Sequence, residues 1–280
     1  MKEIKFLIPY VVFTAFSYYF AKNGLIYASP FAFMGLRYLV AAGILLTISK
    51  KIILSRNLLY LSLMTITSTM FWSYGLLYVS PAESAVLSYS MPLFSLPIAF
   101  MMVKEKPSRT ELAGIFVGFA GIMIYGLPLL QGFTEVGMFL TIINAFFWGM
   151  FTVFYRKLRD QDPVSINASQ MLIGGLIMMA LSPFDFTLKI NYEFLIDLAW
   201  MATLGGAVQF LLWNYMIRIS KVNRVTVLAF SVPIFTMILS AIMTDALPGI
   251  LAISGVAIMF SGILVSRIRG GISIVNEAAH

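Results

Sequence analysis

The segment WSYGLLYVSPAESAVLSYSMPLFSLPIAFMMVKEKPSRTELAGIFVGFAG, residues 72–121, occurs a second time in this chain in diverged form. The second copy covers residues 213–262 and begins WNYMIRIS. The matched residues share one spacing of 141 positions, which is the distance from Pro92 to Pro233. The other matched pairs are Trp72 and Trp213, Tyr74 and Tyr215, Pro107 and Pro248, Gly114 and Gly255, and Gly121 and Gly262. One offset for so many tryptophan, tyrosine, proline and glycine residues indicates an internal duplication.

The composition is that of an integral membrane protein. Hydrophobic residues make up 60% of the chain and charged residues only 11%, whereas soluble domains carry about 25% charged residues. The chain has no cysteine, which excludes disulfides, thiolate metal sites and a cysteine nucleophile. Its single histidine, His280, is the last residue. The charged start Met1-Lys2-Glu3 leads directly into an apolar run, which we interpret as a retained first helix rather than a signal peptide.

Ten apolar runs predict an all-α integral membrane protein with ten transmembrane helices, because a spanning helix needs about 20 apolar residues. The loops between the runs are short and leave no room for a soluble domain. The predicted helices are residues 4–22, 30–49, 57–79, 81–103, 109–128, 134–157, 163–183, 192–217, 221–244 and 247–267.

The basic residues predict the orientation in the membrane. Lysine and arginine concentrate in cytoplasmic loops, and all but three of the 19 basic residues lie at the two ends and in alternate gaps between the runs. The exceptions are Lys22, Arg37 and Lys189. The net charge of +7 is therefore spread along one membrane face, which argues against a nucleic-acid partner. We expect a multi-pass protein of the cytoplasmic membrane with both termini in the cytoplasm.

The duplication and the helix count together predict an inverted repeat. Each half holds five predicted helices, an odd number, so the two halves enter the membrane from opposite sides. The expected units are a first five-helix repeat at residues 1–130, a second at residues 131–270, and a cytoplasmic C-terminal tail at residues 271–280. Repeats of this kind form transporters with a substrate site at the midplane between the halves.

Several motifs resemble the drug/metabolite transporter superfamily, in its EamA-like branch of ten-helix transporters. They are Gly35-Leu36-Arg37-Tyr38, Pro81-Ala82-Glu83-Ser84-Ala85 leading to Pro92-Leu93, and Lys104-Glu105-Lys106-Pro107 followed by Gly114, Gly118 and Gly121. The resemblance covers nearly the whole chain and implies export or exchange of small metabolites. The sequence departs from the family pattern at Asp245-Ala246-Leu247, where the second copy lacks a glutamate in the turn.

Polar and aromatic residues recur at spacings of three and four along several predicted helices and so share helix faces. Unpaired amides are costly in hydrocarbon, so these faces should point into the bundle. The candidate substrate-binding residues are Arg37, Trp72, Ser84, Ser88, Asn144, Trp148, Phe151, Asn167, Gln170, Gln209, Trp213 and Asn214.

These residues also have structural interpretations, which stay open at the level of sequence. The serines can serve close helix packing, and Trp72 and Trp213 can belong to interfacial aromatic belts. Arg37 is the one charge well inside a run, and Glu83 is a candidate structural partner for it. The glycines at 114, 118 and 121 predict a close-packing face for another helix or for a dimer partner, so the protein is expected to be a monomer or a homodimer.

The residue types and motifs that the sequence lacks exclude several kinds of chemistry. We find no Asp or Glu deep in any run, so proton coupling has no evident carrier. The sequence has no paired intramembrane acids, no histidine-based zinc motif and no phosphate-binding glycine loop, so we expect no enzymatic activity, metal or cofactor.

We predict a secondary transporter or facilitator for small polar metabolites, most of all amino acids, acting by alternating access with bends at Pro92 and Pro233. Multidrug or quaternary-cation efflux is an alternative, although it would favour a carboxylate in the cavity. A nucleotide-sugar carrier would favour several inward-facing basic residues, and only Arg37 qualifies. A channel would conduct far faster than a carrier, and an intramembrane lipid enzyme would need a catalytic group that we do not find.

Overall fold

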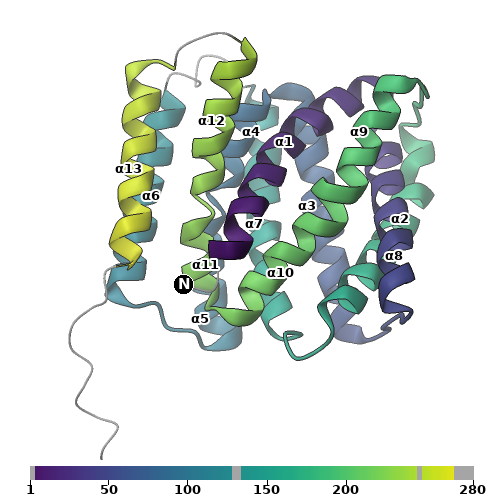
Figure 1. Ribbon diagram of the computed structural model, residues 1–280, viewed down its shortest axis with the longest axis horizontal. Helices are drawn as coiled ribbons and strands as arrows, with labels where there is room; N and C mark the ends of the chain where they lie inside the picture. Colours follow the sequence, from purple (N-terminus) through teal and green to yellow (C-terminus); the bar gives the residue numbers. More distant parts are fainter. Residues whose placement is uncertain (1–3, 128–133, 245–247, 268–280) are drawn as a thin grey trace, which may run out of the picture.

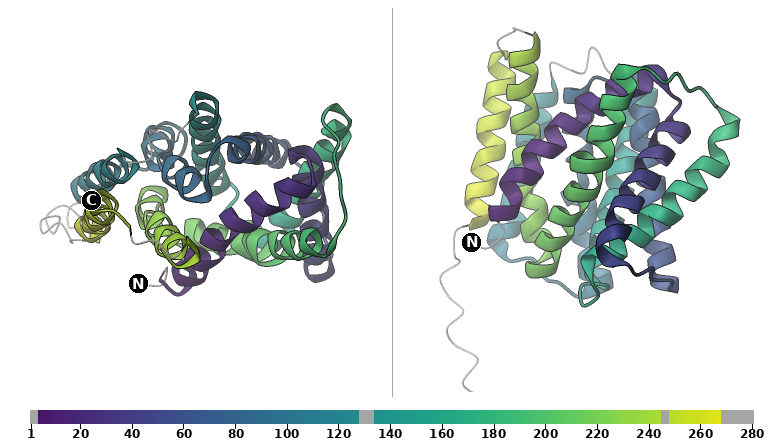
Figure 2. Two further views of the ribbon diagram at one scale, coloured as in Figure 1. Left: turned by 90° about the horizontal axis from the view of Figure 1, so that it is seen from above. Right: turned by 45° about the vertical axis from the view of Figure 1, so that its right-hand side comes forward.

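The computed structural model describes residues 4–127, 134–244 and 248–267, which form a bundle of helices (Figure 1). The first half holds α1 Ile4–Tyr27, α2 Pro30–Ser49, α3 Arg56–Tyr78, α4 Pro81–Ser88, α5 Met91–Val103 and α6 Arg109–Gly126. The second half holds α7 Glu135–Arg156, α8 Pro163–Leu181, the short η2 Ser182–Phe184, α9 Tyr192–Ala202, η3 Thr203–Val208, α10 Gln209–Ile219, α11 Val222–Leu228, α12 Ser231–Thr244 and α13 Ile250–Arg267. The start of α1 and the end of α13 lie at the same end of the bundle, which we call the N-terminal face (Figures 1 and 2).

Eight of the helical segments in the described part of the chain are long and apolar enough to cross a membrane. This confirms a multi-pass, all-helical membrane protein. Four of these segments, residues 81–103, 163–184, 192–219 and 222–243, are each built from more than one helix of the structure. The predicted runs 57–79 and 109–128 correspond to α3 and α6, which lie in the same bundle but are not among the eight. The count of ten spans therefore stays a prediction.

Two of the predicted helices are interrupted at related places. The break between α4 and α5 falls at Tyr89 and Ser90, and the break between α11 and α12 falls at Ala229 and Phe230. At each break the backbone makes i→i+3 bonds, from Ser90 N–H to the Leu87 carbonyl (3.1 Å) and from Phe230 N–H to the Val227 carbonyl (3.2 Å). The prolines of the repeat follow at once, Pro92 as the second residue of α5 and Pro233 as the third of α12. Proline has no N–H for an i→i−4 bond, which explains why both helices stop here.

The two glycine faces of the repeat pack against each other, α6 against α13. A Cβ on Gly114 would lie 2.7 Å from the Gly262 carbonyl oxygen, and one on Gly121 would lie 2.6 Å from the Gly255 carbonyl oxygen. The relation is reciprocal, because each helix presents its first glycine to the second glycine of the other. This face is thus occupied by a helix of the same chain, one of the two partners that the sequence allowed.

We expect Gly121→Ala to destabilise the protein. The added methyl would meet backbone atoms of α13 that cannot turn aside, and such overpacking costs about 1–3 kcal/mol. The matched control is Gly43→Ala in α2, where nothing lies within 4 Å of the new Cβ. The midpoint of thermal unfolding in detergent should fall for Gly121→Ala and stay level or rise for Gly43→Ala. Equal midpoints for the two variants would contradict the assigned packing.

Candidate substrate-binding pocket

A pocket with about 570 Å³ of empty space lies in the middle of the bundle, between helices of both halves of the chain. Six of the twelve predicted binding residues line it. The lining consists of Tyr10, Thr14, Ser17, Tyr18, Arg37, Ser68, Thr69, Trp72, Ser88, Tyr89, Asn144, Trp148, Gln209 and Phe210.

Arg37 is the charged residue of this lining, and backbone carbonyls hold it in place. Its Nε donates to the Met201 carbonyl (3.0 Å) and its Nη2 to the Gly205 carbonyl (2.7 Å). Gly205 lies in η3, a π-helix, in which the Gln209 N–H bonds to the carbonyls of Leu204 and Gly206 rather than to that of Gly205. Such π segments are frequent at functional sites. Nη1 contacts the Met34 sulfur at 3.6 Å, a weak acceptor, and so keeps hydrogen-bonding capacity.

Glu83, the carboxylate expected to pair with Arg37, has a different role. It accepts a hydrogen bond from the Ser80 N–H (2.6 Å) and completes a capping box at the start of α4. The charge of Arg37 is instead balanced by carbonyl dipoles and by ring faces. Its Cζ lies 5.8 Å from the Trp72 ring centroid and 6.0 Å from that of Phe210.

The pocket combines a hydrogen-bonded polar wall with unpartnered groups. Ser68 Oγ donates to Asn144 Oδ1 (2.8 Å), and Asn144 Nδ2 donates to Ser88 Oγ (2.9 Å), which connects α3, α7 and the end of α4. By contrast, the buried Trp72 Nε1 and Gln209 Oε1 have no hydrogen-bond partner in the described part of the chain. Buried polar groups are normally satisfied, so one free donor and one free acceptor in a cavity mark places where a ligand can bind.

Three predicted residues form a separate cluster outside the pocket lining. Gln170 Nε2 and Asn214 Nδ2 both donate to Asn167 Oδ1, at 2.6 and 2.8 Å, and Asn167 Nδ2 donates to the Pro163 carbonyl (2.8 Å). These amides are fully buried and largely satisfy one another. Their geometry fits the structural interpretation, in which they join α8 to α10.

The remaining predicted binding residues, Trp213, Phe151 and Ser84, are buried but do not line the pocket. Trp213 is fully buried, donates from Nε1 to Thr152 Oγ1 (3.1 Å) and stacks on Tyr10 with ring centroids 5.0 Å apart. Phe151 contacts the Trp148 ring at 4.8 Å. Ser84 is buried, and its hydroxyl has no partner among the described residues. Among the predicted binding residues, Trp148 and Gln209 thus line the pocket, whereas Gln170 and Trp213 do not.

The sequence analysis missed the contribution of α1. Tyr10, Thr14, Ser17 and Tyr18 all line the pocket, and none of them is among the predicted binding residues. A signal was present, because these positions follow the i, i+4, i+7, i+8 pattern of one helix face. The helix is so apolar around this stripe that hydropathy alone hides it.

A buried carboxylate was also missed. Asp197 lies inside the predicted run 192–217, is 2% exposed and accepts a hydrogen bond from Asn23 Nδ2 (2.7 Å). Asp197 lies in the second turn of α9, near a helix end rather than deep in the run, yet its side chain is buried. Asp197 is not part of the pocket lining, but an uncoupled mechanism can no longer be argued from an absence of buried acids.

A multi-pass helical bundle with a polar, aromatic pocket between its two halves defines a membrane transport protein. The sequence model of the EamA-like transporter family matches residues 1–127 and again residues 135–268. The chain belongs to this family, which confirms the resemblance to the drug/metabolite transporter superfamily.

Similar proteins are named as transporters. The chain is 46% identical over 255 residues to "Uncharacterized transporter in sor 3'region" of Acidianus ambivalens, covering 89% of this chain and 99% of that protein. It is 30% identical over 126 residues to a riboflavin transporter of Brucella anthropi, a match to 41% of this chain and 44% of that protein. A crystal structure with 14% sequence identity matches with a TM-score of 0.81 over 95% of this chain and 96% of the other. At that identity the likeness shows the fold alone.

Proposed function

We propose that this protein is a secondary transporter or facilitator that exports or exchanges small zwitterionic metabolites, with amino acids as the substrate class. The observation that carries the proposal is the set of free hydrogen-bonding groups in the pocket. Arg37 Nη1 and Trp72 Nε1 are donors on neighbouring side chains, and Gln209 Oε1 is an acceptor. Two donors suit a carboxylate, and an acceptor among aromatic faces suits an ammonium group.

The same groups argue against the two other transport classes. A quaternary cation would meet the positive charge of Arg37 and, among the residues that line the pocket, no carboxylate. A nucleotide sugar would need several basic groups for its phosphates, and this lining offers one. Riboflavin, the substrate named for one partial relative, is planar and would suit the walls formed by Trp72, Trp148 and Phe210.

We further propose that residues 1–130 and 131–270 form inverted repeats of five spans each, which alternate access to the pocket. Three observations support this. The family model matches each half separately. The glycines of α6 and α13 contact each other reciprocally, as a two-fold axis requires. The helix breaks before Pro92 and Pro233 recur in both halves. The distribution of basic residues supports the cytoplasmic membrane, with the N-terminal face in the cytoplasm.

A ligand screen by thermal shift tests the substrate class, because a ligand that binds only the folded state stabilises it by about 2.7 kcal/mol at 100 times its Kd. We expect phenylalanine or another amino acid to raise the unfolding midpoint. Phenethylamine, which lacks the carboxylate, and 3-phenylpropionate, which lacks the amine, should each give a smaller shift. Tetraethylammonium, UDP-glucose and riboflavin represent the other classes. A shift with one of these and none with any amino acid would contradict the proposed substrate.

A further inference from the structure

Two basic side chains cap equivalent helix ends on opposite faces of the bundle. Lys22 of α1 donates to the carbonyls of Leu76 and Leu77, the latter at 3.3 Å, at the end of α3. Arg156 of α7 donates from Nη1 to the carbonyls of Ile217 (2.6 Å) and Arg218 (3.1 Å), at the end of α10. The accepting residues match in the repeat, because 217 and 218 lie 141 positions after 76 and 77. Cations are favourable at helix C-termini, where carbonyls lack intrahelical partners.

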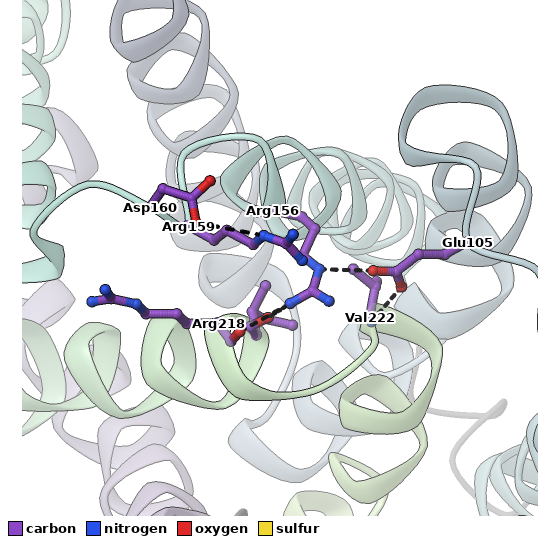
Figure 3. A network of polar contacts seen from close by, with 7 residues as sticks. Glu105, Arg156, Arg159, Asp160, Arg218 and Val222 are labelled. Atoms are coloured by element: carbon purple, nitrogen blue, oxygen red, sulfur yellow. Dashed lines mark hydrogen bonds and ion pairs between the residues drawn. The ribbon is translucent and has the colours of Figure 1, made fainter.

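The N-terminal face has an additional connection. Glu105, in the loop between α5 and α6, pairs through Oε1 with Arg156 Nε at 2.7 Å and accepts through Oε2 from the Val222 N–H at 2.8 Å. Both charged side chains are largely buried, with 13% and 12% exposure. Figure 3 shows Arg156 held between Glu105 and the last turn of α10. The first half of the chain is thereby tied to α7 and to both helices of the α10–α11 hairpin.

The two sequence positions that match Glu105 and Val222 in the repeat do not carry the groups that make this connection. The position 141 residues after Glu105 is Ala246, which has no carboxylate and lies outside the described residues. The position 141 residues before Val222 is Pro81, which has no N–H to donate. At the opposite face the two halves are joined by other hydrogen bonds, from Asn23 Nδ2 to Asp197 Oδ2 (2.7 Å), from the Ser29 N–H to the Thr187 carbonyl (2.8 Å) and from the Lys189 N–H to the Tyr27 carbonyl (2.7 Å). Among the described residues, the end of α3 carries the Lys22 cap without an ion pair like that of Glu105 and Arg156.

The packing around the pocket has the same asymmetry. Trp213, on the side of the N-terminal face, is fully buried between Tyr10 and Thr152. Its repeat partner Trp72 lines the pocket instead and leaves its Nε1 unpartnered. Trp213 thus packs among aromatic rings, whereas Trp72 borders the pocket with an unpartnered Nε1.

We infer that Glu105 and Arg156 form a latch that holds the N-terminal face closed and that must break for the pocket to open there. This rests on the alternating access that we propose as the function. Opening would separate the α10–α11 hairpin from the loop between α5 and α6. Among the described residues this ion pair has no counterpart at the other face, so its loss should favour opening at the N-terminal face alone.

The absence of native cysteines allows a direct test that needs no substrate. Ser88→Cys places one thiol in the pocket, and its labelling by a membrane-impermeant maleimide is timed in proteoliposomes. Molecules with the N-terminal face outward are identified by cleavage of a C-terminal tag. Glu105→Gln should speed labelling from that face by about tenfold or more, since a minor state of 0.1–10% can rise that far. Labelling from the opposite face should slow or stay level.

The matched control is Asp160→Asn, which removes one negative charge from the exposed Arg159–Asp160 pair at the same face (Figure 3). It should leave labelling unchanged. Arg156→Lys, which keeps the charge but cannot reach all three oxygen partners at once, should act like Glu105→Gln. Faster labelling of Glu105→Gln from both faces would indicate that this variant is misfolded. The latch would then be judged from the labelling of Arg156→Lys. An unchanged rate in both latch variants, or an equal rise in Asp160→Asn, would overturn the latch without bearing on the substrate class.

Discussion

Arg37→Lys is expected to weaken substrate binding by about tenfold to a hundredfold. Lysine keeps the charge, but its single ammonium cannot bond the carbonyls of Met201 and Gly205 and also reach the pocket. The substrate carboxylate would lose a charge-assisted hydrogen bond, worth about 1.5–3 kcal/mol. The carbonyl left unpaired in η3 should also lower the free energy of unfolding by about 1–3 kcal/mol.

The measurement is the Kd of the amino acid that gives the largest thermal shift, determined with protein whose folding is checked by its unfolding midpoint. The matched control is Met34→Leu, which removes the sulfur contact of Nη1 and leaves the guanidinium and its carbonyl partners in place. Met34→Leu should change the Kd little. A Kd for Arg37→Lys within about twofold of that of the unaltered protein would assign Arg37 a purely structural role.

The second large effect is expected on the transport rate of Pro92→Ala and Pro233→Ala. Each alanine restores an N–H and removes the clash that ends the preceding helix, a penalty of about 3 kcal/mol or more in a continuous helix. The straightened segment α4–α5 or α11–α12 should then favour one conformation. We expect the rate in vesicles to fall on the order of tenfold, which corresponds to about 1.4 kcal/mol, with the equilibrium Kd largely unchanged.

Pro97→Ala is the matched control, because Pro97 lies inside α5, away from the break. It should change the transport rate less than either gating variant. Normal rates in both Pro92→Ala and Pro233→Ala would make these prolines static features that shape the pocket. A loss of ligand binding together with transport would place their effect on the pocket rather than on its motion.

Features that depend on neighbouring residues in the chain were predicted from the sequence, whereas features that depend on contacts between distant helices were not. Helix positions follow from local hydropathy, so most of the ten runs coincide with helices of the structure. The breaks at Tyr89 and Ala229 were foreseen as bends, because proline acts within its own helix. The π segment at Thr203–Val208 was not, because the guanidinium of Arg37 that bonds its Gly205 carbonyl is distant in sequence.

The assignment of polar residues to the pocket was correct only in part, because it too depends on contacts between distant helices. Spacing shows which residues share a helix face, and it placed Asn144 and Trp148 together in the pocket. It does not show which neighbour covers that face. Asn167, Gln170 and Asn214 have the same pattern, but they bond one another in an amide cluster outside the pocket lining.

The sequence by itself determined the class of protein and indicated the duplication, because apolar composition and a fixed offset are properties of the chain alone. It also marked Arg37 as exceptional, since a charge within an apolar run is conspicuous without coordinates. Only the tertiary structure decided what that charge does, which glycine meets which, and how Glu105 reaches Arg156 and Val222. Those outcomes depend on contacts between helices far apart in sequence, and such contacts produce no periodic pattern along the chain.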